Sequence, residues 1–110
     1  MTDDEAFWDL STDRHPEHTV LRVSGDLDLE TAPRLLAGAE PHLAGSTDAL
    51  IIDLSTLQFI DSSGLSALIR INQRMVAAGR PLTIIAPAPQ VAKAFEITGL
   101  DQILPLRPAA

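Results

Sequence analysis

An amphipathic helix placed between two short, almost wholly apolar runs is the pattern that most constrains the fold. The helix is predicted over residues 65–76, where apolar residues recur at intervals of three and four. Gly79 supplies a helix stop, and Pro81 prevents continuation. The flanking runs, 50–54 and 82–86, have the length and composition of strands covered on both faces. A strand, a helix and a strand in this order favour a parallel crossover.

The N-terminal part of the chain extends this pattern. Residues 7–12 and 19–24 are rich in strand formers and are predicted to form a hairpin. The segment 25–28 is expected to break the second strand. A helix is expected to follow, beginning between Asp28 and Thr31, because Pro33 fits only in a first helical turn.

The C-terminal part adds one more helix and one more strand. A helix is predicted to open at Pro89 and to close at Gly99. Residues 103–104 are expected to form a short last strand. The whole order predicts one α/β domain over residues 1–110, with its core at about 7–106. Its sheet is expected to be mixed but mostly parallel, with four to five strands and helices packed on it.

Charge and composition exclude several classes of function. The net charge of −7 argues against nucleic acid and anionic membranes as partners, since both attract Lys and Arg. The absence of cysteine excludes disulfides and thiolate chemistry. No apolar run reaches the length of a membrane span, and the first residues are acidic where a secretory signal would be basic. These features predict a cytoplasmic protein.

The segment Asp61-Ser62-Ser63-Gly64-Leu65 lies between a buried run and the amphipathic helix, and it allows two interpretations. In the first, Asp61 or a serine only caps the helix, and Gly64 helps the chain to turn. In the second, the turn presents a serine hydroxyl at a sheet edge, where sites in open α/β folds usually lie. A phosphoryl group there would face the free N–H groups of the helix start and would add about −1.5 to −2 charge units.

These residues resemble the signature of STAS domains, specifically of bacterial anti-sigma factor antagonists. The resemblance is carried by residues 50–55 (Leu-Ile-Ile-Asp-Leu-Ser) and by 59–65 (Phe-Ile-Asp-Ser-Ser-Gly-Leu). A second matching segment is 23–28, followed by Thr31 and Ala32. The similarity runs from about residue 7 to residue 106.

The resemblance implies a phosphorylation switch that acts on transcription, as in stress responses. In this family an anti-sigma factor that is also a serine kinase binds the unphosphorylated antagonist and releases its sigma factor. The kinase then uses ATP to phosphorylate the antagonist, which breaks the complex, and a serine phosphatase resets it. The phosphoacceptor position matches Ser63, with Ser62 as the fallback. The positions implied in partner binding are Asp28, Asp61, Ser62, Gly64 and Leu65.

Two other functions are weighed against the switch. A scaffold, such as the STAS subunit of a lipid-transport ATPase complex, would bind its partner constitutively. A serine hydrolase would need a Gly-x-Ser-x-Gly elbow and a partnering histidine, and the sequence offers neither in an evident arrangement. The chain is therefore predicted not to be an enzyme, and no metal or cofactor is expected, ATP being bound by the kinase.

Four further side chains carry expectations. Asp28 is expected to cap the first helix, a role compatible with partner binding. Asp53, at the end of a buried run, is expected to be a hydrogen-bonded carboxylate at a strand end. Arg70 lies off the apolar stripe of its helix and is expected to be solvated, with a part in a partner surface as the alternative. Trp8 is expected to cover the core or a sheet edge.

Overall fold

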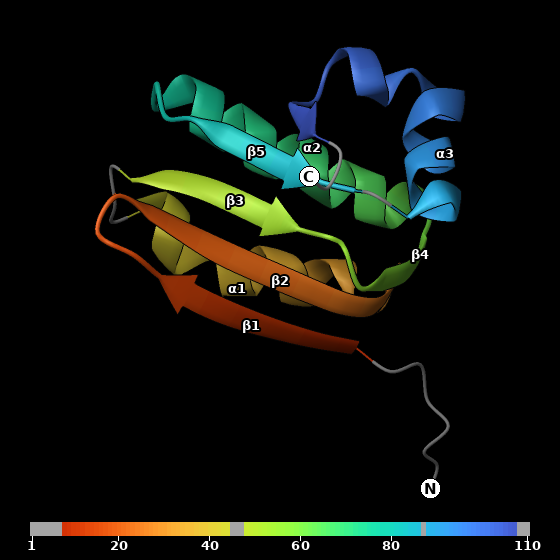
Figure 1. Ribbon diagram of the computed structural model, residues 1–110, viewed down its shortest axis with the longest axis horizontal. Coiled ribbons are helices and arrows are strands. Elements are labelled where there is room, and N and C mark those ends of the chain that lie inside the picture. The colour runs from red at the N-terminus through yellow and green to blue at the C-terminus, as the bar shows by residue number, and fades with distance from the viewer. Residues whose placement is uncertain (1–7, 45–47, 87, 108–110) are drawn as a thin grey trace, which may run out of the picture.

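The protein is described by a computed structural model over residues 8–44, 48–86 and 88–107. Over these ranges the chain forms one sheet and three α-helices (Figure 1). The strands are β1 (Trp8–Arg14), β2 (His18–Leu27), β3 (Ala49–Asp53), β4 (Leu57–Ile60), β5 (Leu82–Ile85) and β6 (Leu106–Arg107). The helices are α1 (Ala32–Ala44), α2 (Ser62–Ala77), α3 (Pro89–Thr98) and the short 3-10 helix η1 (Leu100–Gln102).

The sheet is mixed and mostly parallel, which confirms the predicted fold class. Its order is β1-β2-β3-β5-β6, with β4 beside β2 outside this path. Among the described strands only the β1–β2 hairpin is antiparallel, and the pairs β2–β3, β2–β4, β3–β5 and β5–β6 are parallel. The carboxyl ends of β2 and β4 therefore meet at one edge of the sheet.

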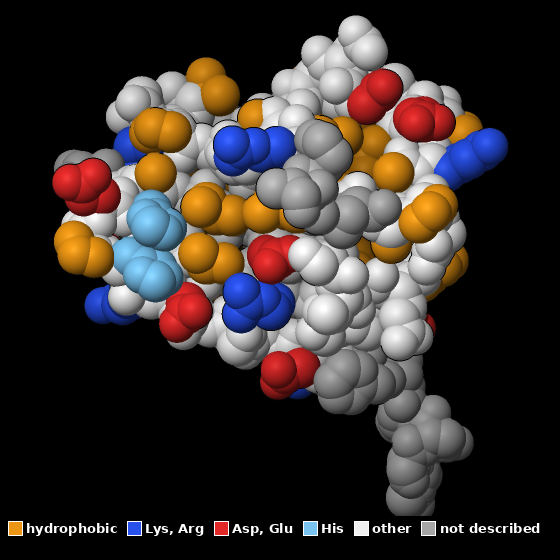
Figure 2. Space-filling view, viewed as in Figure 1, with side chains coloured by type: hydrophobic (Ala, Val, Ile, Leu, Met, Phe, Trp, Pro, Cys, Tyr) orange, Lys and Arg blue, Asp and Glu red, His pale blue; other side chains and the backbone are white. Residues whose placement is uncertain are grey.

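One face of the sheet carries the core. Helices α1 and α2 lie side by side across this face, and α3 packs beside β4 (Figure 1). Alternate residues of β2 point into the core, and Leu21, Val23 and Leu27 are fully buried there. Figure 2 looks onto the face that α1 and α2 leave uncovered, where apolar side chains alternate with charged ones and histidines.

β2 is longer than expected, and this difference creates an unexpected strand. The strand does not end before Gly25 but continues through Leu27. Gly25 has a φ of 91°, a conformation that glycine adopts at little cost. The pairing register shifts between Gly25 and Asp26, which marks a β-bulge. Beyond the bulge β2 pairs with β4 instead of β3, so the sheet of the described residues holds six strands, where four to five were expected.

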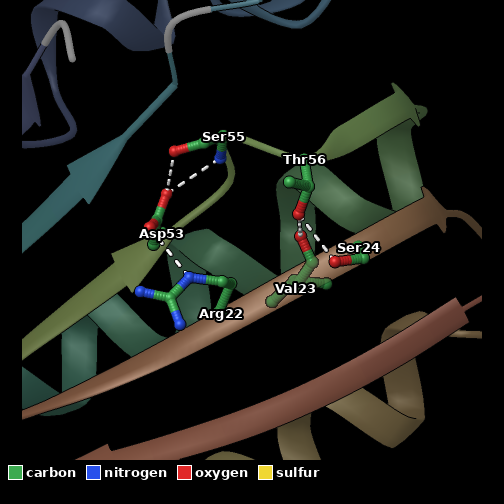
Figure 3. Close-up of polar contacts among 6 residues, drawn as sticks. All are labelled: Arg22, Val23, Ser24, Asp53, Ser55 and Thr56. Atoms are coloured by element: carbon green, nitrogen blue, oxygen red, sulfur yellow. Dashed lines mark hydrogen bonds and ion pairs between the residues drawn. The ribbon is translucent and has the colours of Figure 1, made fainter.

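Side-chain hydrogen bonds hold the corner between β3 and β4 (Figure 3). The Asp53 carboxylate accepts hydrogen bonds from the backbone N–H and hydroxyl of Ser55. The Arg22 guanidinium donates to the same carboxylate at 3.2 Å. On the next residue, the Thr56 hydroxyl lies 2.6 Å from that of Ser24. These bonds join β2 to the corner and fix where β4 begins.

The helix ends largely follow the sequence. Gly79 and Gly99 have φ of 68° and 77°, the left-handed conformation expected after α2 and α3. The prediction of a last strand at residues 103–104 is wrong, because Ile103 follows η1 and is 66% exposed. The chain pairs with β5 only after Pro105, at Leu106–Arg107.

Arg80, in the loop between α2 and β5, binds the end of α1 and the residue that precedes β3. Its guanidinium donates hydrogen bonds to the backbone carbonyls of His42, Leu43 and Asp48, at 2.8 to 3.2 Å. The first two carbonyls lie in the last turn of α1, where the final four C=O groups have no partner within the helix. Arg80 therefore ties the end of α1 to the start of β3.

No helix of the described residues is long and apolar enough to cross a membrane.

Candidate functional site

The site forms where β2 and β4 end side by side. Leu27 and Ile60, the last residues of these strands, are register partners. The backbone N–H of Asp61 donates to the carbonyl of Leu27 at 3.1 Å. Asp28 and Asp61 each follow one of these strands directly. The fold therefore brings together the two sequence segments that were singled out separately.

Asp61 caps α2, as one of the two sequence interpretations predicted. Its backbone is extended, with φ of −116° and ψ of −171°. One carboxylate oxygen accepts from the backbone N–H groups of Ser63 at 2.8 Å and Gly64 at 3.1 Å. The expectation that these groups are free to receive a phosphoryl group is therefore wrong. Asp61 already occupies two of the donors at the helix start.

Asp28 has the predicted capping role at the entry to α1. Its carboxylate accepts hydrogen bonds from the N–H groups of Glu30 at 3.0 Å and Thr31 at 3.1 Å. In return, the Thr31 hydroxyl accepts from the N–H of Asp28 at 2.8 Å. This hydroxyl also lies 2.8 Å from the Asp26 carbonyl. The turn is thus rigidly tied to the end of β2.

Gly64 allows α2 to approach the strand ends closely. A Cβ at this position would lie 2.7 Å from the Leu27 carbonyl oxygen and 2.8 Å from Cγ1 of Ile60. With contacts this short, any larger residue must displace the start of α2 or the end of β2. The packing of the turn therefore favours glycine.

The residues expected to contact a partner divide into two groups. Ser62 is exposed, and Ser63, Asp28 and Asp61 are partly exposed. Leu65 and Gly64 are buried, and their expected part in partner binding stays a prediction. They shape the turn from the inside, while the two serines and the two aspartates form its surface.

Ser63 opens into a hollow between α1 and α2. The hollow has a volume of about 260 Å³. Its lining is apolar apart from two serines and one charged residue, and consists of Leu29, Ala32, Pro33, Leu36, Ser63, Ser66, Ala67 and Arg70. Leu29 is 75% exposed, although its side chain is large and apolar. Sequence reasoning did not identify the hollow, because its walls come from two helices whose packing the sequence does not reveal.

A second hollow continues along the same helix pair. It has a volume of about 380 Å³ and shares Leu36 and Arg70 with the first. Within it, the Arg74 guanidinium forms two hydrogen bonds with the Glu40 carboxylate, at 3.1 and 3.2 Å. Outside this hollow, Phe59 on β4 is a second large apolar side chain that is exposed, like Leu29. It is 50% exposed and lies two residues before Asp61.

Asp53 is a structural carboxylate, as expected. Partial burial by itself would raise the pKa of its carboxyl. The hydrogen bonds from Ser55, together with the hydrogen bond and charge of Arg22, outweigh this effect and hold the pKa below its ordinary value. The residue is therefore ionised and committed to the β3–β4 corner. Within residues 8–44, 48–86 and 88–107, no group of three or more His, Asp or Glu side chains could hold a metal ion.

Comparison with known proteins agrees with this architecture. A protein-family model described as "Mlab, STAS domain" matches residues 10–107. The crystal structure of an anti-sigma factor antagonist from Mycobacterium paratuberculosis superposes with a TM-score of 0.87 at 30% sequence identity, covering 98% of this chain and 92% of that one. The anti-sigma-B factor antagonist of Listeria monocytogenes is 26% identical over 95 residues, which cover 86% of this chain and 83% of the relative.

A more distant structure shows the same fold. The anti-sigma factor antagonist SpoIIAA in its unphosphorylated form superposes with a TM-score of 0.79 at 22% identity. The superposition covers 93% of this chain and 89% of that one.

Proposed function

The chain belongs to the STAS domain family, and from this membership we propose that it is an anti-sigma factor antagonist controlled by phosphorylation of Ser63. In its unphosphorylated form it binds a cytoplasmic anti-sigma factor and frees the sigma factor. The anti-sigma factor is also the serine kinase that modifies Ser63, and a serine phosphatase restores the hydroxyl. The chain itself contributes a binding surface and a phosphoacceptor, with no catalytic group and no cofactor of its own.

The position of Ser63 is the observation that carries this proposal. The side chain is partly exposed and lines the hollow between α1 and α2, so a kinase can reach it. The backbone beneath it is fixed by the Asp61 cap and by the tight packing of Gly64. A phosphoryl group can therefore be added without disturbing the core. Ser62 is more exposed but does not line the hollow.

The transfer follows ordinary phosphoryl chemistry. The Ser63 Oγ attacks the γ-phosphorus of ATP bound to the kinase. An Oγ–P bond forms, and the bond from the γ-phosphorus to the β–γ bridging oxygen breaks, so that ADP leaves. The hydroxyl proton passes to a base of the kinase, because the Asp61 carboxylate is held by the backbone N–H groups of Ser63 and Gly64.

The electrostatic surroundings explain why the modification ends binding. The turn is already acidic, because Asp26, Asp28, Glu30 and Asp61 all lie at the ends of β2 and β4 or in the turns that follow. Phosphorylation adds about −1.5 to −2 charge units to the same surface. A partner that covers the turn must desolvate this charge. A loss of about 4 kcal/mol would weaken binding roughly a thousandfold.

The proposal is tested by incubating the purified chain with each serine-kinase anti-sigma factor of the same genome and ATP. We expect one kinase to phosphorylate the wild type at Ser63, as mapped by mass spectrometry. Ser62→Ala, a matched control one residue away, should still be modified, whereas Ser63→Ala should not. Phosphate found only on Ser62, or on neither serine, would refute this assignment.

A further inference from the structure

Arg70 lies in the same hollow as Ser63 and has no partner there. Among the described residues that line this hollow, it is the only charged one. Its guanidinium makes no hydrogen bond or ion pair with any residue of the described part of the chain. Arg74, one helical turn further along α2, is bound to Glu40. An unpaired arginine is thus held beside the proposed phosphoacceptor.

The helix start does not offer a phosphate the donors that this site would otherwise supply. Asp61 occupies the N–H groups of Ser63 and Gly64. The Asp61 carboxylate would also repel a phosphate on Ser63, because both groups carry negative charge. A cation from elsewhere in the fold would therefore stabilise a dianion at this position more than the helix start does.

Helical geometry places Arg70 and Ser63 on the same side of α2. The two residues are seven positions apart in α2, so they lie on the same helix face about 10.5 Å apart along the axis. Side chains in a helix point toward its N-terminus, which directs Arg70 toward Ser63. The same tilt turns the Ser63 side chain toward the start of α2, so the contact requires the Arg70 side chain to extend along the hollow that both residues line.

Resting on the proposed function, we propose that Arg70 binds the phosphoryl group of phosphorylated Ser63 within the hollow between α1 and α2. A guanidinium matches the oxygen geometry of a phosphate and can donate two hydrogen bonds to it. The phosphate and Arg70 then lie across a hollow that is open in the unmodified chain. Arg70 is thus a positioning residue for the modified state.

This pairing changes what phosphorylation does to the binding surface. In the unmodified chain, Leu29, Pro33 and Leu36 leave an apolar hollow open for a side chain of the partner. The phosphate–Arg70 pair fills this hollow with a hydrated ionic group. Phosphorylation therefore acts twice: it adds charge at the turn, and it removes the apolar hollow beside it.

The test measures the phosphate directly and does not require the kinase. Phosphoserine is incorporated at position 63 of the full chain during translation, in the wild type and in the variants Arg70→Gln and Arg74→Gln. The pKa of the phosphoserine is then measured by ³¹P NMR at low salt. Arg74→Gln is the matched control, since it removes the same charge from the same helix, about 16 Å from Ser63 along the axis.

We expect Arg70→Gln to raise the phosphoserine pKa by about half a pH unit, because a paired cation favours the dianion. Arg74→Gln should leave it at the wild-type value. Equal values in the wild type and Arg70→Gln would overturn the proposal, and so would equal shifts in the two variants. A failure of every kinase to modify Ser63 would instead refute the proposed function, without affecting this measurement.

Discussion

Gly64→Ala tests how the turn that carries Ser63 is built. The new methyl group would lie 2.7 Å from the Leu27 carbonyl oxygen, 2.8 Å from Cγ1 of Ile60 and 2.9 Å from Cγ of Leu27. The first neighbour is backbone, and this carbonyl already accepts the hydrogen bond from Asp61. It cannot move aside alone, so the start of α2 must shift.

The magnitude is the difference between two opposing effects. Overpacking of this kind typically costs about 1 to 3 kcal/mol. Alanine returns up to about 1 kcal/mol through its higher helix propensity. From the middle of both ranges we expect Gly64→Ala to lower the free energy of unfolding by about 1 to 2 kcal/mol. Such a loss is a large part of the 5 to 15 kcal/mol typical of a domain.

Gly38→Ala is the matched control in the neighbouring helix. Its methyl group would meet Cδ2 of Leu10 at 2.2 Å, an even shorter contact. That atom, however, is the end of a flexible side chain on the edge strand β1, and the next neighbour lies 3.7 Å away. Leu10 can rotate away, so we expect a net change within about 0.5 kcal/mol, after the gain in helix propensity.

Urea denaturation followed by circular dichroism measures both variants. With a typical slope of about 1 to 3 kcal/mol per molar, Gly64→Ala should lower the midpoint by roughly 1 M at an unchanged slope. Gly38→Ala should unfold close to the wild type. The reasoning fails if Gly64→Ala is as stable as the wild type, or if Gly38→Ala loses more stability than Gly64→Ala.

Two further predictions concern the junction at the end of α1. Arg80→Met removes the donors to the carbonyls of His42, Leu43 and Asp48, and should cost about 2 to 3 kcal/mol in urea denaturation; a loss below 0.5 kcal/mol would contradict the role given to Arg80. Burial lowers the pKa of the His42 imidazole, and the positive charges of Arg14 and Arg80 lower it further. As the pH falls, the unfolded chain therefore binds the proton before the folded chain does. The contribution of His42 to the free energy of unfolding should be fully present above pH 6.5 and should be lost as the pH drops through this value. His42→Gln should weaken this pH dependence, and an identical profile would contradict the assignment.

Much of the fold follows from local patterns in the sequence. α2 has a continuous apolar stripe and a glycine stop, so no tertiary contact is needed to predict it. β4 was missed, because its four residues appear in the sequence as an extension of the preceding apolar run. The strand exists only because β2 continues past the bulge at Gly25 and offers it a partner. Such long-range pairing leaves no periodic signal.

The site shows the same division between local and long-range effects. The cap at Asp61 and the capping turn at Asp28 involve neighbours within three residues, so the sequence predicted both. It could not show that Asp61 takes the donors a phosphate would need. It also could not relate Arg70 to Ser63, because the hollow they share depends on the packing of α1 against α2.

The most direct test compares the affinity of the unmodified chain and of the chain phosphorylated at Ser63 for its kinase partner. Isothermal titration calorimetry with a non-hydrolysable ATP analogue keeps both forms unchanged during the measurement. A roughly thousandfold weaker complex with the phosphorylated chain is predicted, from a loss of about 4 kcal/mol. Equal affinities would contradict the switch and would indicate a STAS domain that binds its partner constitutively.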